Sequence, residues 1–414
     1  MTLNVDLRQV IHALADALDL VGVDDVAHGK RVGVMAAECG RVEGLAADEV
    51  AFLFELGMLH DIGVSSTRVH GHLVESFDWS GAQAHCQVGY ERVRGFAPLE
   101  AMALPILYHH TRWDVLQNLP LPARVKRQAN LIYLVDRVDA LAAPHYGDKA
   151  LLLFTEEIRA RIAEHAGSYF APELVEIFLE ASRAEAFWLM LEPRSLEALR
   201  PETTGAGGMF SAKAGELYQL GEIFARIVDA KSPFTAEHSL GVARLARYLG
   251  ERLGLEAGHV DRLEIAALLH DLGKLRVPDE ILDKPGRLDA RERKIINAHS
   301  FETFRILRGI RGFEEIALWA ACHHEEPDGS GYPFHLDAAA TPLEARILRV
   351  ADIFQAMVQE RPYRQGMDDA AVARFMGELV AVGRCEARLV DALLADLPAA
   401  RRQACGAGVA PPQP

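Results

Sequence analysis

The chain has little cysteine and no long hydrophobic run. Its five cysteines are spread over 414 residues and form no CxxC pair (Cys39, Cys86, Cys322, Cys385 and Cys405). An odd, scattered set argues against a disulfide framework and is typical of a reducing compartment. No segment approaches the roughly 18 uninterrupted apolar residues of a membrane span, and Asp6 and Arg8 interrupt any signal-peptide core. We therefore expect a soluble, cytoplasmic protein without a membrane partner.

Runs of basic residues are also missing. The formal net charge is -15 and the isoelectric point is about 5.6. A surface that binds duplex nucleic acid normally carries a basic stripe, so we expect no duplex partner. A small anionic substrate stays open, because metal ions and a few Lys or Arg can reverse the local charge.

Strand-type alternation is almost absent, whereas helical periodicity runs through the chain. Leu7, Val10, Ile11 and Leu14 follow the i, i+3, i+4, i+7 pattern of an amphipathic helix. The stretch PETTGAGG at 201–208 interrupts the periodicity, as a linker does. These patterns predict an all-α protein with two helical domains at 1–192 and 211–400, a linker at 193–210 and a disordered tail at 401–414.

A set of His and Asp residues occurs twice, in the same order. The first copy is His28, His60, Asp61, His85, His109, His110 and Asp136, and the second is His238, His270, Asp271, His299, His323, His324 and Asp352. The first two histidines are 32 positions apart in both copies, and the third and fourth are 24 apart in both. A repeat of this length indicates a duplicated domain.

Each copy offers imidazoles together with carboxylates. A short acidic side chain has two oxygens and can bridge a pair of metal ions, while imidazoles supply terminal ligands. This mixed N/O set suits Fe, Mn, Zn or Ni. The sequence therefore predicts two tandem helical bundles, each with a His/Asp metal centre.

The second half resembles a known family. The stretches SPFTAEHSLGVARLA, HDLGKLRVPDEILDKPGRLDARER, HHEEPDGSGYP, TPLEARILRVADIFQAM and ERPYR are similar to those of the HD-GYP phosphodiesterases of bacterial cyclic dinucleotide signalling. The resemblance covers roughly residues 212–383. It implies a metal-dependent hydrolase that opens a cyclic dinucleotide to the linear form. Cyclic di-GMP is the usual substrate of this family, and a mixed cyclic GMP–AMP is a serious rival that nothing in the sequence separates from it.

The resemblance also implies roles for single residues. His238, His270 and Asp352 would hold one metal ion, and His299, His323 and His324 the other, with Asp271 as the bridge and iron or manganese as the expected metals. Lys274 would contact a phosphate and take part in catalysis. Tyr332 of the Gly-Tyr-Pro motif and Arg361 would bind the substrate, the first at a base and the second at a phosphate.

The second half departs from the family pattern in two places. Gln355 replaces a second Asp of the ADxxDAL motif, which we expect to tune a ligand rather than to remove a metal ion. Phe234 stands four residues before His238, where members with three metal ions carry an acid. This predicts two metal ions in the C-terminal centre.

The first half, roughly 21–142, keeps every ligand but loses the substrate features. Val64 replaces Lys274, and no Gly-Tyr-Pro or RPYR motif follows. Asp139 is present where the second copy has Gln355, and Asp24, four residues before His28, could hold a third metal ion. One interpretation is a decayed copy kept for packing or dimerisation. The other is a live centre that removes the 5′-phosphate of the linear product.

Two further hypotheses belong to other classes of protein. A binding module that senses the nucleotide without cleaving it is disfavoured by the complete ligand set and by Lys274. A diiron oxygenase is disfavoured for the second half by its phosphate-binding groups, and less so for the first half. The sequence also leaves room for a homodimer.

Overall fold

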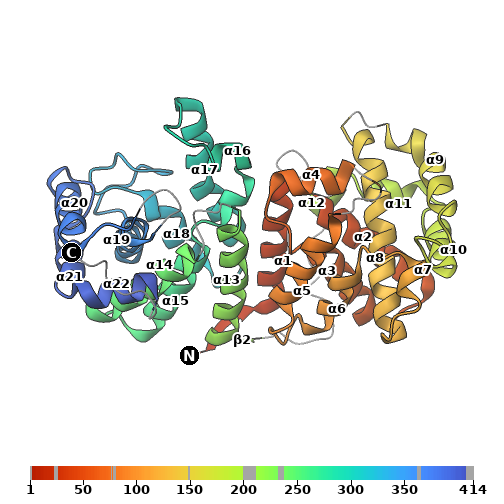
Figure 1. Cartoon of the computed structure of the whole chain (residues 1–414), viewed down its shortest axis with the longest axis horizontal. Coiled ribbons are helices and arrows are strands. Elements are labelled where there is room, and N and C mark those ends of the chain that lie inside the picture. The colour runs from red at the N-terminus through yellow and green to blue at the C-terminus, as the bar shows by residue number, and fades with distance from the viewer. Residues whose placement is uncertain are drawn as a thin grey trace. The chain divides into compact units, whose positions relative to one another are not determined.

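A computed structural model describes residues 2–22, 27–75, 77, 81–147, 150–198, 211–231, 237–360 and 365–406. The chain divides into two compact units, Leu14–Gly208 and a second unit made of Met1–Ala13 and Met209–Pro414. The described residues are helical almost throughout, which confirms the predicted all-α class (Figure 1). The first thirteen residues belong with the C-terminal unit, which the sequence did not indicate.

The N-terminal unit is a bundle that begins within helix α1 (Leu7–Leu18). Its further helices are η1 (Asp19–Gly22), α2 (His28–Glu43), α3 (Ala47–Leu59), α4 (Thr67–Glu75), α5 (Ala82–Val93), α6 (Glu100–Tyr108), α7 (Trp113–Leu116), α8 (Ala123–Ala142), η2 (Ala143–His145), α9 (Leu151–Ala163), α10 (Pro172–Ala181), α11 (Glu185–Leu189) and α12 (Pro193–Ala198). Helix α12 lies in the predicted linker, so that segment is helical in part.

The C-terminal unit contains the two strands of the described residues, β1 (Thr2–Asp6) and β2 (Ser211–Lys213), which pair antiparallel. Its helices are α13 (Ala214–Asp229), α14 (His238–Arg252), α15 (Ala257–Leu269), η3 (Leu272–Arg276), α16 (Asp279–Leu282), α17 (Ala290–Leu307), α18 (Glu314–Ala321), η4 (Cys322–His324), α19 (Leu343–Val358), α20 (Asp369–Ala381), α21 (Ala387–Leu394) and α22 (Leu397–Cys405). Helix α22 extends to Cys405, so the first five residues of the predicted tail are helical.

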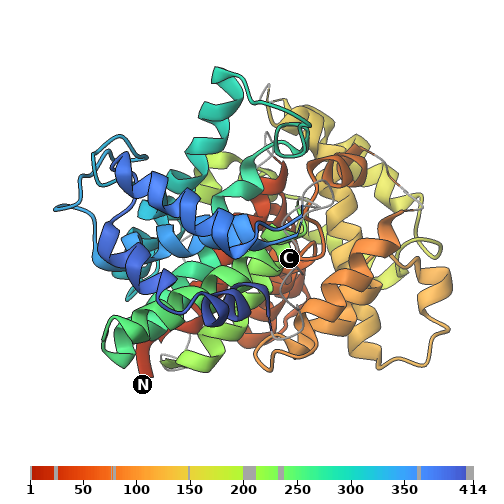
Figure 2. The ribbon, with the colours of Figure 1, turned by 60° about the vertical axis from the view of Figure 1, so that its left-hand side comes forward.

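Equivalent helices carry equivalent residues in the two units. His28 and His238 are the first residues of α2 and α14, which pack on α3 and α15 respectively (Figures 1 and 2). The His-Asp pairs follow directly after α3 and α15. Two glycines let these turns approach the next helix, because a Cβ at Gly63 would lie 1.9 Å from the His85 carbonyl oxygen and one at Gly273 would lie 2.1 Å from that of His299.

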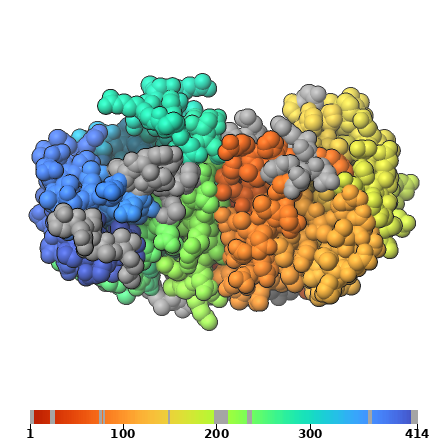
Figure 3. Space-filling view, viewed as in Figure 1, coloured from red at the N-terminus to blue at the C-terminus, as the bar shows by residue number. Residues whose placement is uncertain are grey.

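The part of the C-terminal unit that holds α16 and the first half of α17 projects from the rest of that unit (Figure 1; teal in Figure 3). The residues in the first half of α17 are exposed or half-buried, and the buried residues of this helix begin at His299. This imidazole is therefore carried at the point where the helix enters the core of the unit.

Candidate metal centres

The predicted ligands of the C-terminal unit converge in two groups. The ligand atoms of His238, His270 and Asp352 lie within 4.8 Å of one another, and so do those of His299, His323 and His324. We call these groups the first and the second position of the centre.

Asp271 lies between the two positions. Its Oδ2 is 3.3 Å from Nε2 of His270, and its Oδ1 is 3.4 Å from Nε2 of His299. One carboxylate thus presents one oxygen to each group, which is the geometry that a bridging ligand needs. The structure brings all seven predicted residues of this half together.

The imidazoles are oriented by hydrogen bonds on their far side. Nδ1 of His270 donates to the carbonyl of Ala267 at 2.7 Å, and Nδ1 of His323 donates to that of Ala320 at 2.6 Å. His299 donates in the same way to Ile296 at 2.6 Å. These bonds fix the tautomer and point the Nε2 lone pairs into the centre.

The donor set fits metal ions on an observation of the structure itself. Asp271 Oδ1 and His270 Nε2 are buried, and no hydrogen-bond partner for either exists in the described part of the chain. Buried polar atoms normally have a partner, and leaving them without one is costly. Divalent cations would satisfy these converging atoms.

Charge in the C-terminal centre favours the ligand forms of Asp271, His323 and His324. Burial raises the pKa of the Asp271 carboxyl, but His270 and Lys274 outweigh this and hold it well below its usual value. Burial lowers the pKa of the His323 and His324 imidazoles, and the neighbouring imidazoles lower it further. Asp271 is therefore a carboxylate and the two histidines are neutral, as metal ligation requires. At His270 burial lowers the pKa, but the Asp271 carboxylate outweighs this and raises it to about 9, so this imidazole must release a proton when it binds a metal ion.

Two of the predicted substrate groups lie at this centre. The Lys274 ammonium donates to Oδ2 of Asp271. The Tyr332 ring lies 4.7 Å from the His324 ring, and its main-chain N–H donates to the His324 carbonyl at 3.2 Å. The predicted Arg361 and the position of Phe234 lie outside the described residues.

The loop that carries Tyr332 is anchored by Glu325, which the sequence analysis did not single out. The buried Glu325 carboxylate accepts from the N–H groups of Phe334 at 2.7 Å and Leu336 at 3.0 Å. A Cβ at Gly331 would lie 2.3 Å from the Glu326 nitrogen. The Gly-Tyr-Pro motif therefore also has an architectural role. The sequence feature that could have identified Glu325 is its position directly after His323-His324.

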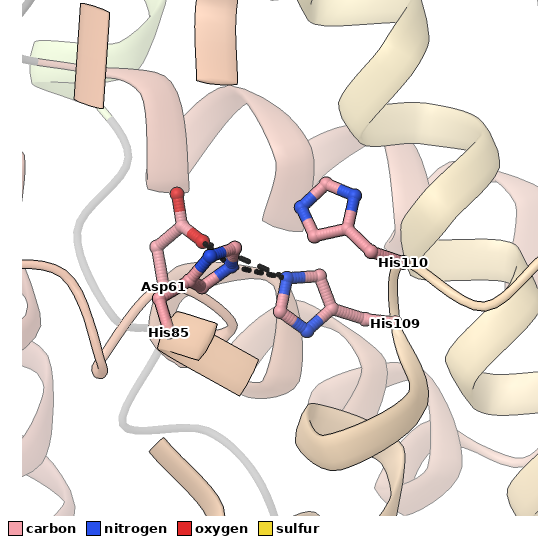
Figure 4. A group of neighbouring side chains, drawn as sticks. All are labelled: Asp61, His85, His109 and His110. Atoms are coloured by element: carbon pink, nitrogen blue, oxygen red, sulfur yellow. Dashed lines mark hydrogen bonds and ion pairs between the residues drawn. The ribbon is translucent and has the colours of Figure 1, made fainter. Parts of the chain in front are cut away.

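The N-terminal unit assembles the second set of ligands in the same way. Asp61, His85, His109 and His110 form one group, and their side chains point toward a common space in Figure 4. His28, His60 and Asp61 form the other group, and Oδ1 of Asp136 lies 3.4 Å from Nε2 of His28. These groups are the second and first positions of the N-terminal centre.

Asp61 corresponds to Asp271. Its Oδ1 is 3.0 Å from Nε2 of His85, and its Oδ2 is 3.6 Å from Nε2 of His60. Within the described residues this Oδ1 has no hydrogen-bond partner, so the N-terminal donor set fits metal ions on the same ground. The predicted additional ligand Asp24 lies outside the described residues.

The N-terminal centre has a cationic side chain at a different place. Val64, at the place of Lys274, is buried. Arg137 donates to Oδ2 of Asp136 from Nη2 at 2.9 Å and from Nε at 3.2 Å, and Nη2 also donates to the Leu73 carbonyl at 2.9 Å. This arginine, adjacent to Asp136 in the sequence, was missed because the second repeat has Ile353 there.

Comparisons with known proteins agree with this geometry. The sequence profile described as HD domain matches residues 222–379. The chain is 38% identical over 396 residues to the 3′3′-cGAMP-specific phosphodiesterase 1 of Vibrio cholerae, covering 94% of this chain and 92% of that protein. It is 40% identical over 174 residues to a cyclic di-GMP phosphodiesterase response regulator of Xanthomonas campestris, covering 41% of this chain and 45% of that protein.

A solved structure is similar over almost the whole chain. It is the crystal structure of a cyclic GMP-AMP specific phosphodiesterase from V. cholerae, with a TM-score of 0.64 and 25% identity. The match covers 95% of this chain and 97% of that one. Both tandem units are therefore part of the similarity.

Proposed function

The chain belongs to the HD-GYP family of cyclic dinucleotide phosphodiesterases, and we propose that its C-terminal centre opens the ring of 3′3′-cyclic GMP–AMP. The choice of nucleotide is supported by the relatives that match over nearly the full length, whose names specify this substrate. The cyclic di-GMP phosphodiesterase of X. campestris matches 41% of the chain. The observation that carries the chemistry is Asp271, which lies between two groups of imidazoles with Lys274 on its carboxylate.

Phosphohydrolases with an HD domain are metal-dependent. In the C-terminal centre, two divalent ions would be held by the first-position and second-position ligands, with Asp271 shared between them. We expect iron or manganese, although the donor set also suits Ni and Zn. When bound, such a pair supplies an activated water and neutralises charge on a phosphodiester.

The protein's own groups would position the substrate. Lys274 is proposed to donate to a non-bridging oxygen of the scissile phosphate, next to the carboxylate that it now contacts. Tyr332 forms a wall beside the His324 ring, where a base or a ribose would be confined. Arg361 is proposed to bind the second phosphate of the cyclic dinucleotide.

A competition experiment tests the substrate. Metal-loaded protein is given equal amounts of 3′3′-cyclic GMP–AMP and cyclic di-GMP, and the ratio of the two kcat/KM values is read from the product composition. We expect at least about a tenfold preference for the mixed nucleotide, about 1.4 kcal/mol of differential transition-state binding. An equal ratio or the reverse preference contradicts the choice of substrate.

For the N-terminal centre we propose a second phosphohydrolase activity, removal of the 5′-phosphate from the linear dinucleotide. Support comes from its full ligand set and from Arg137, which gives this centre a cation at a different place from Lys274. A decayed structural copy is the alternative. The test uses Asp271→Ala protein and synthetic linear 5′-phosphorylated dinucleotide. Release of inorganic phosphate, lost on adding Asp61→Ala, supports the proposal, and no release contradicts it.

Location and assembly complete the proposal. Among the described helices, none is long and apolar enough to cross a membrane. All five cysteines are free, which supports a cytoplasmic location. We also propose that the chain forms a homodimer, which light scattering of the full chain tests.

A further inference from the structure

The first-position histidines of the two centres have different partners. Nδ1 of His28 donates to a carboxylate oxygen of Asp139 at 2.8 Å, whereas Nδ1 of His238 donates to the amide oxygen of Gln355 at 2.6 Å. Both bonds fix the same tautomer. The two imidazoles are thus oriented alike, and what differs is the charge behind them.

Asp139 is held as a carboxylate. Arg31 donates to Oδ1 from Nε at 2.6 Å and to Oδ2 from Nη2 at 2.9 Å, and the Tyr146 hydroxyl donates to Oδ1 at 2.7 Å. Two N–H groups of Arg31 and the hydroxyl of Tyr146 thus donate to the two oxygens, an arrangement that only a carboxylate can accept. A carboxylate behind a ligating imidazole increases the basicity of the ligand atom.

The C-terminal fold has no room for the same device. Gly241 lies three residues after His238, as Arg31 lies three after His28. A Cβ at Gly241 would be 2.2 Å from the Ala404 carbonyl oxygen of α22 and 2.9 Å from Nε2 of Gln355. Helix α22 therefore closes the place that an arginine would need, and a neutral amide remains behind His238.

The second positions of the two centres also differ, but here the C-terminal imidazole has the better outer hydrogen bond. His299 has the Ile296 carbonyl as acceptor for its Nδ1, at 2.6 Å. Nδ1 of His85 is buried with no acceptor in the described residues, and the Ala82 carbonyl one turn earlier accepts from the Cys86 thiol at 3.4 Å. An imidazole without this outer bond is less well oriented and is a weaker ligand.

We propose that in each centre one metal position binds its ion more tightly than the other, and that the tighter position differs between the two centres. In the N-terminal centre the first position, with His28 backed by Asp139, is the tighter one. In the C-terminal centre the second position is the tighter one, and the first, with His238 backed by Gln355, releases its ion first. Within the ring-opening centre, the ion at the His238 position would therefore be lost before the ion at the second position.

The test measures metal retention and needs no substrate, so its outcome is independent of the proposed function. One protein keeps only the N-terminal centre (His270→Ala with Asp271→Ala), and the other keeps only the C-terminal centre (His60→Ala with Asp61→Ala). Each is dialysed against graded chelator, and the metal bound per chain is measured by mass spectrometry. We expect two release steps from each protein.

Reciprocal substitutions then assign the steps. Asp139→Asn, in the N-terminal-only protein, should weaken the tighter step by about 10- to 100-fold, the effect of losing such an outer partner, and bring the two steps together. Gln355→Asp, in the C-terminal-only protein, should strengthen the weaker step. Circular dichroism of the metal-free proteins checks folding.

If Gln355→Asp does not fold, Gln355→Ala replaces it and should weaken the weaker step further. The proposal is overturned if Asp139→Asn moves only the weaker N-terminal step, if the Gln355 variants move only the tighter C-terminal step, or if no step moves.

Discussion

Lys274 is the residue that separates the chemistry of the two centres most clearly. Its ammonium lies on Asp271, the carboxylate shared by both metal positions, whereas the buried Val64 occupies the corresponding place in the N-terminal unit. A cation at that point can donate to a phosphate oxygen without displacing any imidazole. We therefore assign it to the transition state of ring opening.

Replacing Lys274 by Met tests this role. The aliphatic stem is kept and the donor is lost, so kcat for ring opening should fall by about 100- to 1,000-fold, as for other single donors to a developing charge. Metal content, measured by mass spectrometry, should stay the same. Lys294→Met, on the exposed part of α17, is the matched control. Unchanged kcat in Lys274→Met would remove this lysine from the mechanism.

Several site residues could be predicted because the same His and Asp residues occur twice in the sequence, in the same order and at similar spacing. All the described ligands meet in space as their order and spacing indicated, from His28 to Asp352. Arg31 and Arg137 were not predicted, since each acts through a contact with Asp139 or Asp136 that only the folded chain shows. Buried cations of this kind leave no periodic pattern.

At the scale of elements, two close approaches hold the C-terminal centre together. One is the turn after α15, where Gly273 meets the backbone of α17 at His299. The other is the loop of Tyr332, which is tied to the Glu325 carboxylate. Both bring a ligand histidine into register with the rest of the site.

Gly273→Ala should disturb the first of these approaches. Its Cβ would lie 2.1 Å from a carbonyl oxygen, so α17 must shift, at a cost of about 1–3 kcal/mol in the free energy of unfolding. Metal bound per chain should fall with it. Gly377→Ala is the control, because no atom other than its own helix backbone lies within 4 Å of a Cβ at this position in α20, and it should be neutral or stabilising by about 0.5–1 kcal/mol. Equal effects of the two substitutions would refute the steric account.

Glu325→Gln should loosen the second approach. One of the two main-chain donors would lose a charged acceptor, so amide exchange in residues 325–341 should speed up and KM should rise more than kcat falls. Glu378→Gln, exposed on α20, should change neither. A variant with unaltered exchange in this loop would show that Glu325 does not anchor it.

The helices themselves were predictable from apolar periodicity, but the elements at their junctions were not. The strand β1 and its pairing with β2 join segments more than 200 residues apart, which no local pattern reveals. Helices α12 and α22 extend into stretches whose Gly and Pro content, or position near the chain end, indicated a linker and a tail. Tertiary packing decides these boundaries.

Over the whole molecule, each of the two compact units carries its own set of converging ligands, so we expect the two centres to load metal independently. In protein with Asp61→Ala, added metal should slow amide exchange in α14–α19 and leave α2–α8 unaffected, since metal binding stabilises only the unit that binds it. Asp271→Ala should give the converse. Hydrogen exchange followed by mass spectrometry reads both. Protection of both units in either variant would contradict independent centres.

The formal charge of -15 also has to be reconciled with an anionic substrate. The net charge does not favour long-range attraction of a cyclic dinucleotide, so we expect much of the affinity to come from the metal ions and from local cations such as Lys274. Removing the metal should therefore weaken substrate binding, measured by calorimetry, as well as stop turnover.

We assign ring opening to the C-terminal centre, and analysis of the reaction products checks this assignment. Metal-loaded wild-type, Asp271→Ala and Asp61→Ala proteins are incubated with 3′3′-cyclic GMP–AMP and with cyclic di-GMP, and the products are separated over time. We expect that Asp271→Ala leaves the rings closed, while Asp61→Ala opens them and accumulates linear dinucleotide that keeps its 5′-phosphate. Closed rings with the wild-type protein over a range of metals, or ring opening by Asp271→Ala, would contradict this assignment.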